Sequence, residues 1–386
     1  MDNNISINTN LIFIGRPSFP IGGAMTKRHK YYIDHLASKA DLSICNICTW
    51  SEGGKNREVG TYKDVVDYYN TTYPPSFSSI PKIAKWANRI LESRYRKNYN
   101  NIAIFCSYFT IEQIPILLKA KKMGYKIICD VVENYNAPGS DSSKQMKFSF
   151  AISKTFLYKK VDGFIVISNL LKQVYKNYGK PTLLLTNSAP ITIDENKHKT
   201  GYHSPMRIVY TGTYASKDGL SFLIEGFNKF IREEGNVAEL ILIGKGKGNE
   251  KTEKLIADNK QIKRLGFVSD ETLAKIQNSA DLLCMTRCNS PFANYGFPFK
   301  LSEYMATGNP VLATSVGDVS LYIKDKENGL LVNPSNSEAI YKALEYAYHH
   351  PLECIKMGRK SLNTIQESFD VHKNGETLFN FIKSFS

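Results

Sequence analysis

Residues 291–318 have the sequence PFANYGFPFKLSEYMATGNPVLATSVGD. This stretch combines a loop, the start of a charged helix and a buried strand, and the rest of the fold is interpreted from it. Residues 295–298 are predicted to form a loop, because Gly296 is conformationally permissive and Pro298 forces the residue before it into an extended conformation. Apolar residues at helical spacing then predict a helix that ends near Gly308, and residues 311–314 predict a short buried strand. The stretch therefore predicts a loop, a helix and a buried strand in succession.

The start of this helix has the chemistry of a nucleotide site. A helix that follows a loop directs unpaired N–H groups and the positive end of its dipole outward, and Lys300 adds a full positive charge. Glu303, one turn later, is able to accept hydrogen bonds from two ribose hydroxyls. A phosphate site beside a diol site indicates a nucleotide. From these residues alone, an ordinary surface lysine and glutamate explain the pattern equally well.

Strand-like and helix-like segments alternate along the whole chain. Such alternation predicts parallel strands that are covered by helices on both faces, which is a doubly wound α/β sheet. Residues 50–80, rich in Tyr, Asn, Ser and Pro, are expected to form an irregular loop. In the first half, strands are expected at residues 11–14, 43–48, 102–106, 125–132, 163–168 and 183–185, and a helix is expected at 144–159.

The chain is long enough for two domains, and the pattern starts again after a polar segment with prolines at both ends. We expect a first Rossmann-like domain at 1–187, a linker at 188–205, a second Rossmann-like domain at 206–365 and a final helical segment at 366–386. In the second domain, strands are expected at 207–210, 240–243 and 281–285 and helices at 220–234, 251–258 and 337–348.

The stretch 291–318 resembles the donor-binding signature of retaining GT-B glycosyltransferases of family 4, the glycosyl transferases group 1, of the type found in polysaccharide and lipopolysaccharide biosynthesis. Glu303 matches the second of two glutamates in that signature, which holds the ribose, and Tyr295 stands in place of the first. The resemblance is strong over residues 206–348 and looser over the first half. It implies two Rossmann-like domains facing across a cleft, with the last helix returning to the first domain.

The resemblance also implies roles for individual residues. The family's paired-glycine loop, which faces the reaction centre, is matched by Gly22 and Gly23. Its loop after the first strand of the second domain gives cations to the donor diphosphate; Lys217 matches, whereas Thr213 replaces the usual arginine. From its position, Arg287 is our candidate for the missing cation.

Glu133 lies in the segment DVVEN, residues 130–134, at the carboxyl end of a predicted strand, where ligands of doubly wound sheets bind. In the family a polar residue here faces the donor sugar and the acceptor, and a carboxylate that caps the following turn is the alternative. The expected catalytic groups are Glu133, Lys217 and Lys300. The expected donor-binding residues are Gly22, Gly23, Gly212, Lys217, Phe267, Val268, Arg287, Tyr295, Gly296, Phe297, Phe299, Lys300, Leu301 and Glu303.

No metal motif accompanies these residues: HExxH and clusters of cysteine and histidine at metal-ligand spacing are missing from the sequence. We therefore expect no metal and no cofactor, with a nucleoside diphosphate sugar, UDP- or GDP-linked, as co-substrate. The resemblance implies retention of configuration at the sugar, with the departing phosphate deprotonating the acceptor hydroxyl. Cys45 and Cys48 form an isolated CxxC, which is weak evidence for a metal or redox site.

The positive charge is concentrated in the first half. Residues 1–185 contain 26 Lys and Arg against 13 Asp and Glu, whereas the rest contains 24 against 23, within a total net charge of +14. Such a field attracts anionic lipid, a phosphorylated acceptor or nucleic acid, and an ordinary solvated surface is the alternative. The helix expected at 82–97, with Trp86, could rest on a membrane or simply pack on the sheet.

The chain lacks an apolar run of the ~18–20 residues that a membrane span needs, and its first ten residues do not resemble a signal peptide. We expect a cytoplasmic enzyme, peripheral at the inner membrane face, that transfers a sugar to a glycan or lipid-linked acceptor in surface polysaccharide (capsule, O-antigen or exopolysaccharide) biosynthesis. A GT-B sugar-nucleotide epimerase and a non-catalytic nucleotide-sugar-binding or scaffold protein are the alternatives. Nucleic-acid binding has only the basic charge in its favour.

Overall fold

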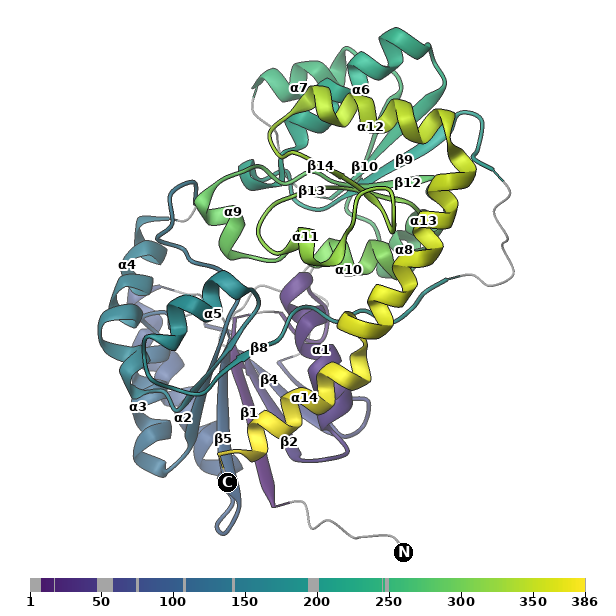
Figure 1. Ribbon diagram of the computed structural model, residues 1–386. Helices are drawn as coiled ribbons and strands as arrows, with labels where there is room; N and C mark the ends of the chain where they lie inside the picture. Colours follow the sequence, from purple (N-terminus) through teal and green to yellow (C-terminus); the bar gives the residue numbers. More distant parts are fainter. Residues whose placement is uncertain are drawn as a thin grey trace, which may run out of the picture. The chain divides into compact units, whose positions relative to one another are not determined.

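The computed structural model describes residues 8–16, 18–46, 58–73, 76–106, 109–140, 143–193, 201–244, 246 and 250–385 (Figure 1). The chain divides into two compact units. The first comprises Met1–Asn136, Ser142–Ser188 and Val371–Ser386, and the second Ala137–Asp141 and Ala189–Asp370. Residues 1–7, where no signal peptide was expected, Cys48 of the CxxC and residues 194–200 of the expected linker lie outside the described residues.

The first unit is a doubly wound sheet with the strand order β3-β4-β2-β1-β5-β6-β7-β8. Every described pairing in it is parallel except that of β3 with β4. The strands are β1 (Thr9–Gly15), β2 (Asp41–Asn46), β3 (Val59–Tyr62), β4 (Val66–Asn70), β5 (Asn100–Cys106), β6 (Lys126–Val131), β7 (Gly163–Val166) and β8 (Thr182–Leu184). The α-helices are α1 (Ala24–Leu36), α2 (Ile80–Arg94), α3 (Gln113–Met123), α4 (Lys144–Ile152), α5 (Asn169–Lys176) and α14 (Val371–Lys383), which packs along α1.

The expectation of an irregular loop at 50–80 was wrong. The described part of this segment contains the hairpin β3–β4, and β4 extends the sheet by pairing with β2. The hairpin turns at Lys63 and Asp64, which both have positive φ angles of 49° and 59°. That turn fits the twist of a hairpin but is usually built from Asn and Gly, so the sequence carries no recognisable turn signal.

Two of the helices expected in the first unit are clearly defined in the structure. The apolar residues Ile83, Ala87 and Ile90 of α2 are buried, and α2 packs against β1, β2 and α3. The helix expected at 144–159 is instead a continuous succession of α4, a π turn η3 (Ser153–Leu157) and a 3₁₀ turn η4 (Tyr158–Lys160). No helix in the described residues is long and apolar enough to cross a membrane.

The second unit is a parallel sheet with the strand order β11-β10-β9-β12-β13-β14. Its strands are β9 (Met206–Thr211), β10 (Ala238–Ile243), β11 (Ile262–Gly266), β12 (Leu282–Met285), β13 (Val311–Thr314) and β14 (Leu330–Val332). The order reverses between β9 and β12, and ligands of doubly wound sheets bind beside the carboxyl ends of the strands at such a switch point. The helices are α6 (Leu220–Glu234), α7 (Glu250–Ala257), α8 (Asp270–Ser279), α9 (Pro291–Tyr295), α10 (Phe299–Met305), α11 (Val319–Tyr322), α12 (Ser337–His349) and α13 (Pro351–Thr364).

The stretch 291–318 folds largely as expected. The loop at Gly296 leads into α10, and β13 has the predicted bounds and is fully buried. One detail differs, because Tyr295 is the last residue of α9 rather than part of the loop. Ser290 starts that short helix by accepting a hydrogen bond from the Ala293 amide at 3.1 Å.

Candidate functional site

A buried carboxylate, Asp218, forms the centre of a charged cluster at the switch point of the second unit. It closes the turn η5 (Ser216–Asp218) after β9 and is only 4% exposed. Its Oδ1 lies 3.5 Å from Nζ of Lys300 and 3.8 Å from Nε of Arg287. Its Oδ2 accepts a hydrogen bond of 3.0 Å from Thr213. We call Asp218, Lys217, Arg287 and Lys300 the Asp218 cluster.

The cluster holds more positive than negative charge. Burial acts to raise the pKa of Asp218, but Lys300, Arg287 and Lys217 outweigh it, so that the pKa of this carboxyl is lowered. Burial lowers the pKa of Lys300, Asp218 opposes this, and the like charge of Arg287 adds to the lowering. One carboxylate thus serves several cations, and a further anion would relieve their repulsion.

Two glycines allow the loops to approach the cluster closely. Gly212 follows β9 with a φ angle of 141°, and a Cβ atom there would lie 2.7 Å from Nζ of Lys300. Gly244 follows β10 with a φ angle of 137°, and its Cβ would lie 1.8 Å from the carbonyl oxygen of Gly212. Any larger residue would therefore displace the lysine or separate the two loops. The Lys300 ammonium also lies 4.2 Å from the centre of the Tyr210 ring, a cation–π contact that helps to hold it.

Arg287, which follows β12, is buried but incompletely hydrogen-bonded. Its Nη1 donates to the carbonyl oxygen of Ala293 at 3.4 Å, and its own carbonyl oxygen accepts a hydrogen bond of 2.8 Å from Thr314. Its buried Nε has no hydrogen-bond partner among the described residues. A buried guanidinium N–H without an acceptor is costly, so this group favours an anionic ligand.

Four further predicted residues, on η5, α9 and α10, are half-buried. Lys217 is half-buried, with Nζ 4.8 Å from the centre of the Phe292 ring. Glu303 and Phe299 are half-buried on α10, and Tyr295 is half-buried at the end of α9.

Three predicted residues are positioned by packing. Leu301 and Gly296 are buried. The ring of Phe297 is buried as well and lies 5.3 Å from the Tyr322 ring and 5.8 Å from the Phe369 ring, measured between centroids. The side chains of Leu301 and Phe297 therefore fix the position of the loop and of α10.

Phe267 and Val268 lie at the carboxyl edge of the same sheet, directly after β11. The Gly244 amide donates to the carbonyl oxygen of Gly266 at 2.8 Å, and the Gly212 amide donates to that of Ile243 at 2.9 Å. These bonds connect the loops after β9, β10 and β11. The ring of Phe267 is 57% exposed.

Gly22, Gly23 and Glu133 belong to the first unit. A Cβ atom on Gly22 would lie 2.2 Å from Oγ1 of Thr26, so this position requires glycine, whereas Gly23 begins α1 in open space. Glu133 is half-buried just after β6.

Sequence reasoning missed Asp218 and Tyr210. Asp218 directly follows an expected phosphate-binding lysine in the loop after β9, and that adjacency was the only available signal. Among the described residues, no group of three or more His, Cys, Asp or Glu is arranged to hold a metal ion.

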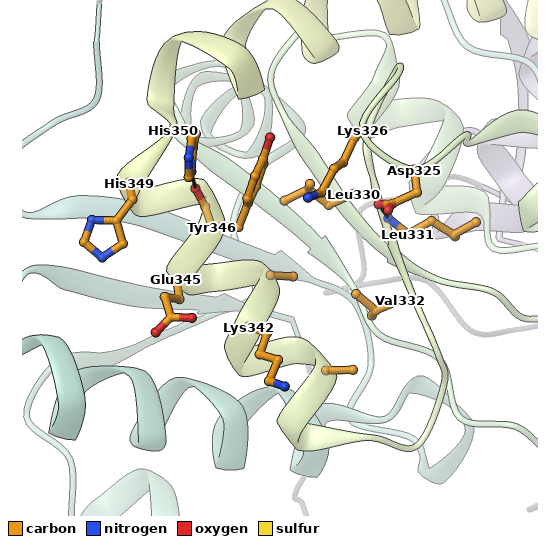
Figure 2. Close-up of a pocket in the computed structure, with 12 residues that line it drawn as sticks. Asp325, Lys326, Leu330, Leu331, Val332, Lys342, Glu345, Tyr346, His349 and His350 are labelled. Carbon is orange, nitrogen blue, oxygen red and sulfur yellow. Dashed lines mark hydrogen bonds between the residues drawn. The ribbon is translucent and has the colours of Figure 1, made fainter.

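A groove of about 610 Å³ lies elsewhere in the second unit, beside the edge strand β14 and α12 (Figure 2). In it, Lys326 covers the Tyr346 ring at 4.1 Å, and His350 stacks on that ring at 4.3 Å. The groove shares no lining residue with the Asp218 cluster. The size of a groove does not by itself indicate a reaction, and the Asp218 cluster remains our candidate functional site.

The sequence of this unit matches a known family. Residues 205–350 match the model of the family described as glycosyl transferases group 1. An uncharacterized glycosyltransferase of Methanocaldococcus jannaschii is 31% identical over 136 residues, which are 34% of this chain and 33% of that protein. The amylovoran biosynthesis glycosyltransferase AmsK of Erwinia amylovora is 25% identical over 148 residues, 37% of this chain and 36% of that protein. The matches therefore span about a third of these relatives.

Solved structures resemble the chain over nearly its whole length. Sucrose-phosphate synthase from Thermosynechococcus elongatus has a TM-score of 0.76 at 14% identity, covering 97% of this chain and 98% of that one. Anabaena HepE in complex with UDP and glucose has a TM-score of 0.69 at 15% identity, covering 97% of this chain and 100% of that one. At these identities the likeness establishes the fold, which is that of the two-domain GT-B glycosyltransferases.

Proposed function

We propose that this protein is a glycosyltransferase that moves a sugar from a nucleoside diphosphate sugar to a hydroxyl acceptor. One observation carries the proposal: Lys300 and Arg287 converge on the single buried carboxylate of Asp218 at the switch point, with excess positive charge. A diphosphate supplies the missing negative charge. The group 1 domain at residues 205–350 and the UDP present in the HepE complex support the same choice of ligand.

In the proposed reaction the diphosphate leaves from the anomeric carbon of the donor sugar. Lys300 and Arg287, assisted by Lys217, stabilise the charge that develops on the leaving oxygen. These protein cations fill the role that a metal ion plays in other transferases, and we propose that the reaction needs no metal and no cofactor. By resemblance, configuration is retained and the departing phosphate accepts the proton of the acceptor hydroxyl.

The other predicted residues receive roles in binding. Glu303, one turn from Lys300 on α10, accepts hydrogen bonds from the ribose, and the loop at Phe267 faces the base. UDP and GDP are the proposed leaving groups. Gly22, Gly23 and Glu133 of the first unit would contact the donor sugar and the acceptor.

The proposed acceptor is a glycan or a lipid-linked sugar in surface polysaccharide biosynthesis. The relative AmsK, named for amylovoran biosynthesis, supports this choice. The concentration of positive charge in the first half of the chain supports a cytoplasmic protein that contacts the inner membrane face and its anionic lipids.

A donor panel tests the proposal. The protein is incubated with UDP-, GDP-, dTDP-, CMP- and ADP-linked sugars, and release of the free nucleotide is measured with and without a mixture of lipid-linked acceptors. We expect one nucleotide family to be released, faster with acceptor present. Nucleotide binding without release, in every acceptor mixture, would indicate a binding protein. Interconversion of the sugar without release would indicate an epimerase.

A further inference from the structure

Two large apolar side chains are exposed on one helical segment of the first unit. The segment 144–160 comprises α4, the π turn η3 and the 3₁₀ turn η4. On it, Phe148 is 60% exposed and Phe156 is 63% exposed. Phenylalanine normally buries its ring, so two such rings on one short segment call for an explanation.

The opposite side of the segment is firmly packed. Phe150, Leu157 and Tyr158 are buried, and the Tyr158 ring lies 5.5 Å from that of Phe164 and 5.2 Å from that of Tyr175. Phe150 and Tyr158 are thus the aromatic residues that this segment contributes to the core. Phe148 and Phe156 are therefore additional to the core, on a scaffold that holds them in place.

The π turn brings the two exposed rings toward one direction. In a regular α-helix, residues eight positions apart differ by about 80° around the axis. A π turn contains more residues per turn, and η3 lies between the two phenylalanines, so it reduces this offset. A π turn interrupts the regular hydrogen-bond pattern of an α-helix, and such turns are frequent at functional sites.

Lysines surround the two rings. Lys144, Lys147, Lys154, Lys159 and Lys160 are all exposed. Residues 143–161 contain no Asp or Glu, and no ion pair joins these lysines to a carboxylate within the described part of the chain. The positive charge of this face is therefore not neutralised by the protein itself.

We propose that the face of residues 144–160 docks on a bilayer that contains anionic phospholipid. Phenylalanines enter the interface between headgroups and acyl chains, while lysines bind the phosphates around them. The helix that the sequence suggested for this role, α2, is less suited because most of its apolar residues are buried and Trp86 is half-buried. Docking on a membrane would bring the enzyme to lipid-linked acceptors. This part of the proposal rests on the proposed function. The docking itself does not, because it is measurable without any donor.

The first test is flotation with vesicles of phosphatidylcholine alone and of phosphatidylcholine mixed with phosphatidylglycerol. We expect binding to the mixed vesicles only, weakened by salt. Lys154→Gln/Lys159→Gln should weaken binding about twentyfold, and Phe148→Ser/Phe156→Ser at least about tenfold. Lys82→Gln/Lys85→Gln on α2 removes the same charge from another exposed surface of the same unit, and should have a clearly smaller effect.

The second test places a reporter in the face itself. Phe156→Trp should shift its fluorescence emission to shorter wavelength with mixed vesicles and be quenched by brominated lipid, whereas Val65→Trp, in the exposed β3–β4 turn, should not. Thermal melting confirms that each variant is folded. Lack of binding to mixed vesicles would overturn the proposal, as would equal losses in both lysine pairs. A change of oligomeric state in Phe148→Ser/Phe156→Ser without vesicle binding would assign the face to a protein contact instead. In every case donor binding is measured separately, so failure here is distinguishable from failure of the proposed function.

Discussion

Asp130 in the first unit and Asp218 in the second are both buried carboxylates next to cations, and the two arrangements differ. In the first unit, Asp130 accepts two hydrogen bonds of 3.1 Å from Nε and Nη2 of Arg28. The same guanidinium donates to the carbonyl oxygens of Leu185 at 2.9 Å and Thr186 at 3.0 Å. In the second unit, Asp218 meets two cations at 3.5 and 3.8 Å, and Nε of Arg287 has no hydrogen-bond partner among the described residues.

The difference separates a structural ion pair from the candidate binding site. Arg28 and Asp130 are both 1% exposed, match each other in charge, and connect α1 to β6 and to the chain after β8. The Asp218 cluster has excess positive charge and longer contacts. The Arg28 guanidinium and the Asp130 carboxylate are hydrogen-bonded to each other without a ligand, whereas Arg287 Nε would gain an acceptor if an anion bound. Buried charge alone would not have distinguished them.

Breaking the complete pair should have the largest effect on stability. We expect Arg28→Met to lower the free energy of unfolding by about 3–5 kcal/mol, because it leaves Asp130 as an uncompensated buried charge. Urea denaturation measures this loss. Lys300→Met is the matched control, with an expected change below about 1 kcal/mol. Equal losses in both variants would show that the two arrangements are equivalent.

Breaking the incomplete cluster should instead affect catalysis. We expect Lys300→Met to lower the rate of sugar transfer about 10²–10³-fold, equivalent to about 2.7–4 kcal/mol, because one cation that stabilises the leaving diphosphate is lost. Initial rates with saturating donor measure this. Lys275→Met removes an exposed lysine from α8 and should leave the rate unchanged. A rate within twofold of the parent in Lys300→Met would contradict the assignment.

Asp218→Asn should change both the stability of the protein and the extent to which a nucleotide stabilises it. We expect it to lower the free energy of unfolding by about 1–3 kcal/mol, because Lys300 and Arg287 lose their shared counter-charge. A bound diphosphate restores negative charge, so UDP or GDP should raise the melting temperature more in the variant than in the parent protein. Thermal shifts at matched nucleotide concentrations measure the difference. A smaller shift in the variant would mean that the anion binds elsewhere.

The pH dependence of stability should show the smallest difference. Burial acts to raise the pKa of Asp130, but Arg28 and His29 outweigh it and bring the pKa to about 2. A carboxyl whose pKa is lower in the folded state stabilises the fold above its unfolded value, and this contribution is lost as the pH falls toward the folded value. We expect Asp130 to contribute a loss of about 1 kcal/mol by about pH 3. In Asp130→Asn, acid titration of the unfolding free energy should lack this component; an unchanged acid slope would contradict it.

Local sequence patterns predicted most of the helices and strands but fewer of the contacts between side chains distant in the sequence. Helix 220–234 and strand 311–314 were predicted with the bounds that the structure has, because glycines flank the first and apolar side chains fill the second. The β3–β4 hairpin and the π turn η3 were missed, since neither has a local signature in this chain. Asp218 was missed because its burial depends on Arg287 and Lys300, each more than sixty residues away, which only the strand order brings to it.

The most direct test of the central claim is calorimetric titration of the parent protein, Lys300→Met and Lys275→Met with a nucleoside diphosphate and with its nucleoside, for the base that the donor panel selects. We expect the parent and Lys275→Met to bind the diphosphate much more tightly than the nucleoside. Lys300→Met should lose most of this preference while its affinity for the nucleoside is unchanged. An undiminished preference for the diphosphate in Lys300→Met would contradict a diphosphate site at the Asp218 cluster.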